Sequence, residues 1–215
     1  MKSLAKSILL SVLMVLPLCA FAADGSSLKP PSGVKVAVVM FEDLECPSCA
    51  FNYPKVWDAA NAHHVPVVLK DFPLGPSHPW SMEAAIWARF FDTQSEKMGE
   101  DFRGYIFKNQ SAIYPSNLRQ YIQKFADEKH VSLPFALDPG DKLKAKVTAD
   151  HDLGVKIGIT QTPTIFVVSN TESREVQQAD QLGQIIEEVQ RKAGPDTKPA
   201  TAKPAGTKTQ KKKAS

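Results

Sequence analysis

Residues 41–53 read FEDLECPSCAFNY and carry two cysteines, Cys46 and Cys49, with Pro47 and Ser48 between them. A valine-rich apolar run leads into this segment, and a run compatible with a helix follows it. Proline is favoured at the first position of a helix, because the N–H that it lacks would have no partner there. The pattern therefore predicts a buried strand, a turn and a helix that begins at Pro47, with Cys46 at its N-cap.

This position makes Cys46 a candidate reactive thiol. The free N–H groups of the first helical turn and the helix dipole both stabilise a negative charge at the N-cap. We therefore expect the pKa of Cys46 to lie below the usual value of about 8.5. Cys49, one turn further along, should be more buried and less acidic, and should resolve a mixed disulfide formed at Cys46. The pair is the candidate redox-active disulfide Cys46–Cys49.

Two cysteines at this spacing can also belong to a zinc site or form a structural disulfide. A structural zinc ion needs four ligands, and His63 and His64 are adjacent in the sequence rather than spaced for a shared metal. A disulfide that closes so short a loop constrains the unfolded chain little. We therefore expect neither a metal nor a cofactor at this pair.

Residues 1–22 have the pattern of an export signal. Lys2 and Lys6 precede an apolar run at residues 8–18, which is short for a transmembrane helix, and residues 20–22 (AFA) form a cleavage motif. Cleavage near Ala22 removes Cys19, the third of three cysteines, so the mature chain keeps only the reactive pair. We expect an exported, periplasmic protein. Lipidation at Cys19 and retention of the segment as an anchor are the alternatives left open.

The net charge of +3 comes from the two ends of the chain. Of the 26 basic residues, two lie in residues 1–22 and six after residue 193, together with one of the 23 acidic residues. The region between has 18 basic and 22 acidic residues, a net charge of about −4, so no nucleic-acid partner is expected. Residues 194–215 lack apolar periodicity and should form a disordered tail. Contact of this tail with anionic surfaces is an open alternative.

Hydrophobic patterning predicts an α/β domain at residues 34–193, after a short polar leader at residues 23–33. We expect strands at residues 34–41, 65–72, 163–168 and 175–178, the first two parallel around a helix at 47–62 and the last antiparallel. Further helices are expected at residues 80–92, 96–109, 118–125, 139–153 and 180–193. Ser116-Asn117 and Asp138-Pro139 are the expected N-terminal caps of the helices at 118–125 and 139–153, and Gly154 is the expected C-terminal end of the latter. The strand-free stretch at about residues 80–153 predicts an inserted helical subdomain.

These motifs together resemble the thioredoxin superfamily, and the helical insertion resembles its DsbA-like branch. The resemblance rests on the CPSC motif, on Pro54, on Thr162-Pro163 before a strand, and on the segments KDFPL (70–74), HPWSM (78–82) and GITQTPTIFV (158–167). It implies an α/β thioredoxin fold with an inserted all-helical subdomain. It also implies that Pro163 is cis and faces the cysteines, that Thr162 pairs with a substrate peptide, and that Pro47 and Ser48 support the site.

Two positions depart from the family pattern. Many relatives carry a buried acidic residue six positions before the first cysteine, where this chain has Met40. Glu42, Asp43 or water would then accept the proton of Cys49. The strongly oxidising members have Pro-His between the cysteines, whereas this chain has Pro-Ser and several acidic neighbours that oppose a thiolate. We therefore predict a pKa of Cys46 that is lowered less than in those members, and a more modest oxidant or even a reductant.

The resemblance implies a thiol–disulfide oxidoreductase that acts on exported proteins and is recycled by a membrane redox partner. Thiol oxidation is the expected direction. A reductase or isomerase is the first alternative, although residues 23–33 leave no room for the dimerisation module that isomerases usually carry, so we expect a monomer. A non-enzymatic module that binds peptides or metal is the second alternative.

Overall fold

The computed structural model describes residues 23–194. The predicted export signal and the predicted tail from residue 195 onward lie outside the described residues. Within residues 23–194, no helix is long and apolar enough to cross a membrane.

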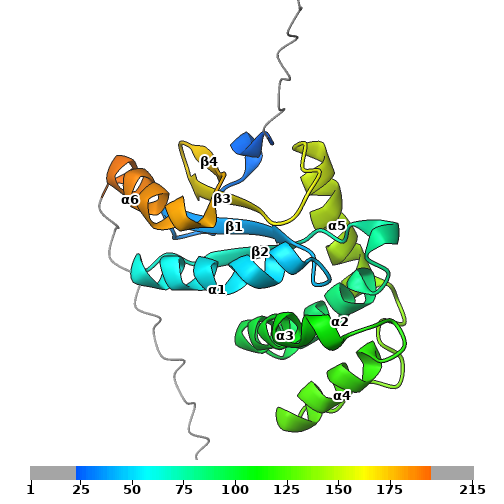
Figure 1. The fold of residues 1–215 in the computed structure, drawn as a ribbon. Coiled ribbons are helices and arrows are strands. Elements are labelled where there is room, and N and C mark those ends of the chain that lie inside the picture. Colours follow the sequence, from blue (N-terminus) through cyan, green and yellow to red (C-terminus); the bar gives the residue numbers. More distant parts are fainter. Residues whose placement is uncertain (1–22, 195–215) are drawn as a thin grey trace, which may run out of the picture.

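A four-stranded mixed sheet forms the centre of the molecule (Figure 1). Its strands are β1 (Val36–Glu42), β2 (Val67–Asp71), β3 (Thr164–Ser169) and β4 (Ser173–Val176), in the order β2-β1-β3-β4. β1 is parallel to β2 and antiparallel to β3, and β4 is antiparallel to β3. The predicted strands are therefore confirmed, with ends shifted by one or two residues. α1 (Pro47–Ala62) connects β1 to β2 with the predicted bounds.

All seven residues of β1 are buried, which explains why the strand is apolar from Val36 to Phe41 rather than alternating. Its even-numbered residues from Val36 to Met40 pack in the larger core, together with residues of α1 and of α6 (Leu182–Ala193). Its odd-numbered residues from Ala37 to Phe41 pack in a second core with Leu28 and Phe72. The helices thus cover both faces of the sheet (Figure 1).

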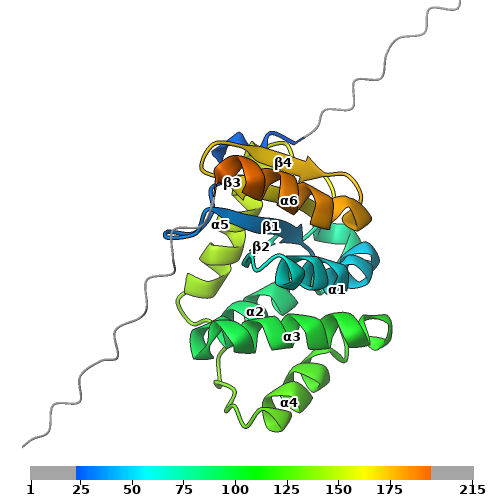
Figure 2. The same cartoon turned by 90° about the vertical axis from the view of Figure 1, so that its left-hand side faces the viewer.

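Four helices lie between β2 and β3 in the chain, as predicted: α2 (Ser81–Gln94), α3 (Glu96–Asn109), α4 (Leu118–Glu128) and α5 (Lys142–Lys156). Figure 2 shows α2, α3 and α4 stacked on the side of α1 that faces away from the sheet. An aromatic cluster joins them, since the ring of Phe91 lies 4.6 Å from that of Phe102 and 4.9 Å from that of Phe125. Buried aromatic packing of this kind dominates the energetics of a small core.

Both ends of α5 differ from the prediction, since the helix spans Lys142–Lys156 instead of residues 139–153. Gly154 does not stop α5 but lies buried within it, where a Cβ atom would come within 2.5 Å of the Phe72 ring. The glycine is needed for close packing of α5 on the second core, and the helix continues to Lys156. α4 begins at the predicted Leu118 with Asn117 as its N-cap residue, but the Asn117 side chain bonds to backbone atoms of Tyr114 and Ala112 instead of capping the helix. Asp138, by contrast, accepts hydrogen bonds from the N–H groups of Leu143 and Lys144 at the start of α5.

A buried ion-pair network connects the sheet to the helical insertion. The Arg103 guanidinium of α3 contacts Glu42 at 3.0 Å, Asp92 at 2.8 Å and Asp71 at 3.5 Å, although its side chain is only 2% exposed. Arg89 of α2 bonds to Asp71 and to Asp150 of α5. The network therefore links β1, β2, α2, α3 and α5 through charged side chains that have little contact with water.

Candidate functional site

The two cysteines occupy the predicted positions at the start of α1. Cys46 is the N-cap residue and Pro47 the first helical residue. Both cysteines are free thiols, and Cys46 is 6% exposed while Cys49 is fully buried. Pro47 and Ser48, between them, are exposed. Cys46 is thus the more accessible sulfur of the pair.

The sheet brings a distant segment against Cys46. In the antiparallel pairing of β1 with β3, Phe41 lies opposite Thr164, so the residues before β3 lie beside those after β1. The Cys46 thiol donates a hydrogen bond to the carbonyl oxygen of Thr162 at 3.3 Å, across 116 positions of sequence. The Thr162–Pro163 peptide bond is cis. The CPSC turn and the segment of Thr162 and Pro163 therefore form one site.

The two thiols differ sharply in acidity. A hydrogen bond from Cys49 is the largest cause that lowers the pKa of Cys46, to about 5, and Thr162 and the backbone N–H groups of Ser48 and Cys49 lower it further against the effect of burial. Burial raises the pKa of Cys49, and the charge on Cys46 raises it further. The lowered pKa of Cys46 agrees in direction with the expectation for an N-cap cysteine.

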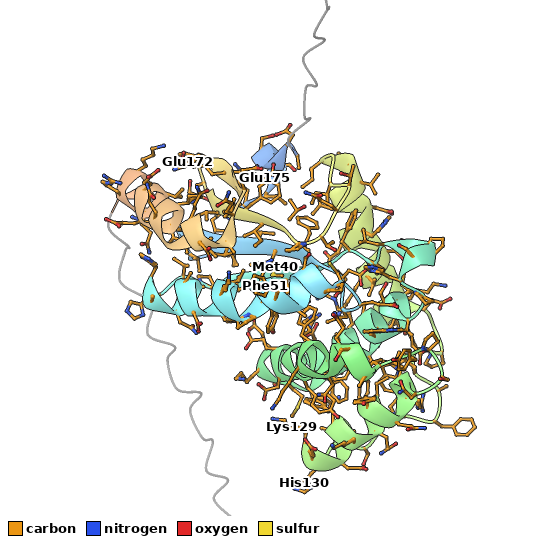
Figure 3. All side chains as sticks on the ribbon, viewed as in Figure 1. Met40, Phe51, Lys129, His130, Glu172 and Glu175 are labelled. Carbon is orange, nitrogen blue, oxygen red and sulfur yellow. The ribbon has the colours of Figure 1, made fainter. Side chains whose placement is uncertain are left out.

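Met40, at the position where many relatives carry an acid, has no ionisable side chain, and the Glu42 carboxylate contacts Arg103. Met40 is fully buried in the larger core (Figure 3). The buried Glu42 carboxylate turns to Arg103, at 3.0 Å, and burial raises its pKa to about 8 against the opposing charge of Arg103. The carboxylate of Glu42 is therefore part of the network that joins the insertion to the sheet.

Asp43 is the acidic residue that contacts Cys49, through its backbone. Its N–H donates to the Cys49 sulfur at 3.5 Å. Its carboxylate accepts bonds from the Glu45 N–H at 2.7 Å, from the Leu74 N–H at 2.7 Å and from Nδ1 of His78 at 2.8 Å. His78, for which the sequence predicts only a position in a loop, therefore contacts the site through its hydrogen bond to Asp43.

Sequence reasoning missed Gln110, which ties the helical insertion to the site. Its amide nitrogen donates to the carbonyl oxygens of Leu44 at 2.8 Å and Cys46 at 3.1 Å. No local pattern marks this residue, because the contact depends on the docking of α3 against α1. The α1 surface that follows the cysteines also exposes an aromatic residue, Phe51, with 66% of its surface accessible (Figure 3).

Within residues 23–194, no group of three or more His, Cys, Asp or Glu side chains is placed to hold a metal ion. The chemistry available at the site is that of the dithiol. A nucleophilic Cys46, a buried Cys49 and polar backbone atoms around both sulfurs suit the making and breaking of disulfide bonds.

We predict that Cys46 of the reduced protein is alkylated by iodoacetamide with a pH midpoint of about 5, whereas in the urea-unfolded chain the midpoint lies at about 8.5. Replacing Cys49 with alanine should raise the folded midpoint, because the largest stabilising hydrogen bond is lost. Since the pKa is lower in the folded chain, the ionised thiol stabilises the reduced protein fully above about pH 8.5, and this contribution disappears as the pH falls through about 5. A folded midpoint near that of the unfolded chain would contradict the prediction.

The thioredoxin family model, Thioredoxin_4, matches residues 32–188 of the chain. In the comparison with curated proteins, none matches this chain. Similar solved structures include DsbA2 of Pseudomonas aeruginosa, with 18% identity and a TM-score of 0.56 over 79% of this chain and 96% of that one. The thiol-disulfide exchange protein alpha-DsbA2 of Wolbachia pipientis has 15% identity and a TM-score of 0.61 over 75% and 86% of the two chains. A periplasmic thioredoxin-like protein of Salmonella enterica serovar Typhimurium has 18% identity and a TM-score of 0.60 over 75% and 87%.

Proposed function

This chain belongs to the thioredoxin family and has the fold of DsbA-type thiol–disulfide oxidoreductases, and we propose that it is an exported enzyme that exchanges disulfides with cell-envelope proteins through Cys46 and Cys49. The observation that carries the proposal is the environment of Cys46. Its sulfur lies at the N-cap of α1, beside Thr162, and the hydrogen bond from Cys49 is the largest cause that lowers its pKa, to about 5. Such a thiol is ionised at neutral pH and is both a nucleophile and a good leaving group.

In the oxidising direction, a substrate thiolate attacks the Cys46 sulfur of the disulfide. A bond forms between the substrate and Cys46, and Cys49 leaves with the electron pair and takes up a proton. A second substrate thiolate then attacks the substrate sulfur of this mixed disulfide, and Cys46 leaves as a thiolate. Two electrons pass from the substrate dithiol to the protein, and a membrane redox partner would remove them.

The acidity of Cys46 supports thiol oxidation as the main direction. A stabilised thiolate favours the reduced protein, which makes its disulfide a better oxidant. The Thr162 backbone lies beside Cys46, and an extended substrate segment would pair with it by β-augmentation. Pro163, Pro47 and Ser48 shape the surroundings of the sulfurs. The export motif in residues 1–22 and the periplasmic relative of Salmonella support a periplasmic location.

The direction is tested by two assays on the full mature protein. The oxidised protein should rapidly introduce disulfides into a reduced, unfolded substrate, and the reduced protein should reduce insulin more slowly. With Ser48 in place of the histidine of the strong oxidants, we expect a reduction potential between about −270 mV and about −120 mV. Insulin reduction without substrate oxidation would support the reductase alternative. Failure of both reactions would refute the proposed enzyme class.

A further inference from the structure

The reaction places negative charge on Cys49, and this sulfur is fully buried. A buried negative charge without a hydrogen-bond donor or an opposite charge beside it costs free energy. The Asp43 N–H lies 3.5 Å from the sulfur and donates to it. Hydrogen bonds to an ionised acceptor are about twice as strong as those between neutral groups. This N–H therefore stabilises the sulfur most when Cys49 leaves or attacks as a thiolate.

The peptide unit that carries this N–H is held on one side by the Glu42 carbonyl, which accepts from the Phe72 N–H at 2.7 Å, and on the other by the turn that the Asp43 side chain anchors. β1 ends one residue earlier, at Glu42, so Asp43 lies outside the strand pairing. One carboxylate oxygen accepts from the Glu45 N–H and closes the turn that leads to Cys46, whose own N–H donates to the Asp43 carbonyl. The other oxygen accepts from the Leu74 N–H and from Nδ1 of His78, which belong to the loop after β2.

We propose that Asp43 and His78 are positioning residues that hold the Asp43 N–H on the Cys49 sulfur and so stabilise the charge that develops there during disulfide exchange. The inference rests on the proposed function and adds residues to it. When a thiolate attacks Cys46, its sulfur bonds to Cys46, the Cys46–Cys49 bond breaks, and the electron pair passes to Cys49. Solvent then supplies the proton, and no further reactant is consumed. The same contact serves the reverse step, in which Cys49 attacks a mixed disulfide.

Glu45 offers a matched control. Its carboxylate also anchors the loop after β2, because it accepts the N–H of Trp80 at 2.8 Å. Its own N–H, however, bonds to Asp43 rather than to a cysteine sulfur. Removing the Glu45 side chain therefore takes away a similar loop contact and a similar negative charge without loosening the donor to Cys49.

The test measures two reactions on each folded variant. The first is the attack of reduced glutathione on the oxidised protein, in which Cys49 is the leaving group. The second is the alkylation of Cys46 by iodoacetamide in the reduced protein, in which Cys49 does not react. We expect Asp43→Ala to slow the glutathione reaction about tenfold, equivalent to about 1.4 kcal/mol, and to change the alkylation rate by less than about twofold.

His78 provides a second pair of variants. His78→Ala should slow the glutathione reaction about threefold, and His78→Asn should restore the rate, because the asparagine amide nitrogen can donate to Asp43 in place of Nδ1. Glu45→Ala should not slow the reaction. If Asp43→Ala does not fold, the His78 pair decides the question.

The outcomes separate the inference from the proposed function. A wild-type disulfide that does not react with glutathione would refute the proposed function. A reactive wild type whose rate is unchanged in Asp43→Ala and His78→Ala would overturn the inference. Equal slowing of the glutathione reaction and of alkylation would also overturn it, because that result indicates general disturbance of the site.

Discussion

Replacing Cys46 with serine should reduce thiol–disulfide exchange to the rate measured without protein. Cys46 is the more accessible of the two sulfurs and the one with the lowered pKa. Serine is similar in size, but its hydroxyl forms no disulfide and is not ionised at neutral pH. The buried Cys49, with its raised pKa, is a poor substitute nucleophile. Oxidation of a reduced, unfolded substrate measures the loss directly.

Cys49→Ser is the matched control for this change. It leaves Cys46 able to attack a substrate disulfide but removes the thiol that resolves the product. We expect mixed disulfides between Cys46 and its substrates to accumulate, and to be released by dithiothreitol on a non-reducing gel. Exchange activity that survives in Cys46→Ser would show that the chemistry occurs elsewhere, and trapping by Cys46→Ser rather than by Cys49→Ser would reverse the two roles.

Arg103→Ala should cause the largest loss of stability among single substitutions in the ion network. The side chain is almost fully buried and contacts Glu42, Asp71 and Asp92. Removing one partner of a buried ion pair costs about 3–5 kcal/mol, because the remaining charges lose their compensation. For a domain of this size, that corresponds to a fall of about 6–20 °C in the melting temperature. Urea unfolding of the oxidised protein measures the change.

The effect of Arg103→Ala should grow with pH. Burial already raises the pKa of Glu42 to about 8 in the folded protein, and the charge of Arg103 opposes this rise. A carboxyl group with a higher pKa in the folded than in the unfolded chain destabilises the fold as the pH rises above the unfolded value. Without Arg103 the pKa of Glu42 rises further, so the variant should lose more stability at pH 8 than at pH 5.

Arg119→Ala is a suitable control, because Arg119 is exposed on α4 and its guanidinium lies over the Trp87 ring. An exposed contact of this kind contributes about 0.5–1 kcal/mol. If Arg103→Ala costs no more than Arg119→Ala at pH 8, the ion network does not hold the insertion on the sheet.

Local patterns in the sequence were sufficient for most of the secondary structure. α1 and α3 have the predicted bounds because Pro47 starts one helix and the Ser95 side chain caps the other. The apolar runs of the strands and the strand-free insertion are likewise visible without coordinates. The boundary at Gly154 could not be predicted, since its glycine serves close packing on Phe72 rather than the end of a helix.

The position of Cys46 and its lowered pKa follow from residues 41–53, because an N-cap forms from neighbours in the chain. The hydrogen-bond partners of the two sulfurs, by contrast, do not follow from this segment alone. Thr162 meets Cys46 through the register of β1 and β3, and His78 meets Asp43 through the loop after β2. The sequence left the acid near Cys49 open among Glu42, Asp43 and water. Packing gave the two acids different contacts, because the buried Arg103 of the inserted helices pairs with Glu42 while Asp43 turns toward the cysteine loop.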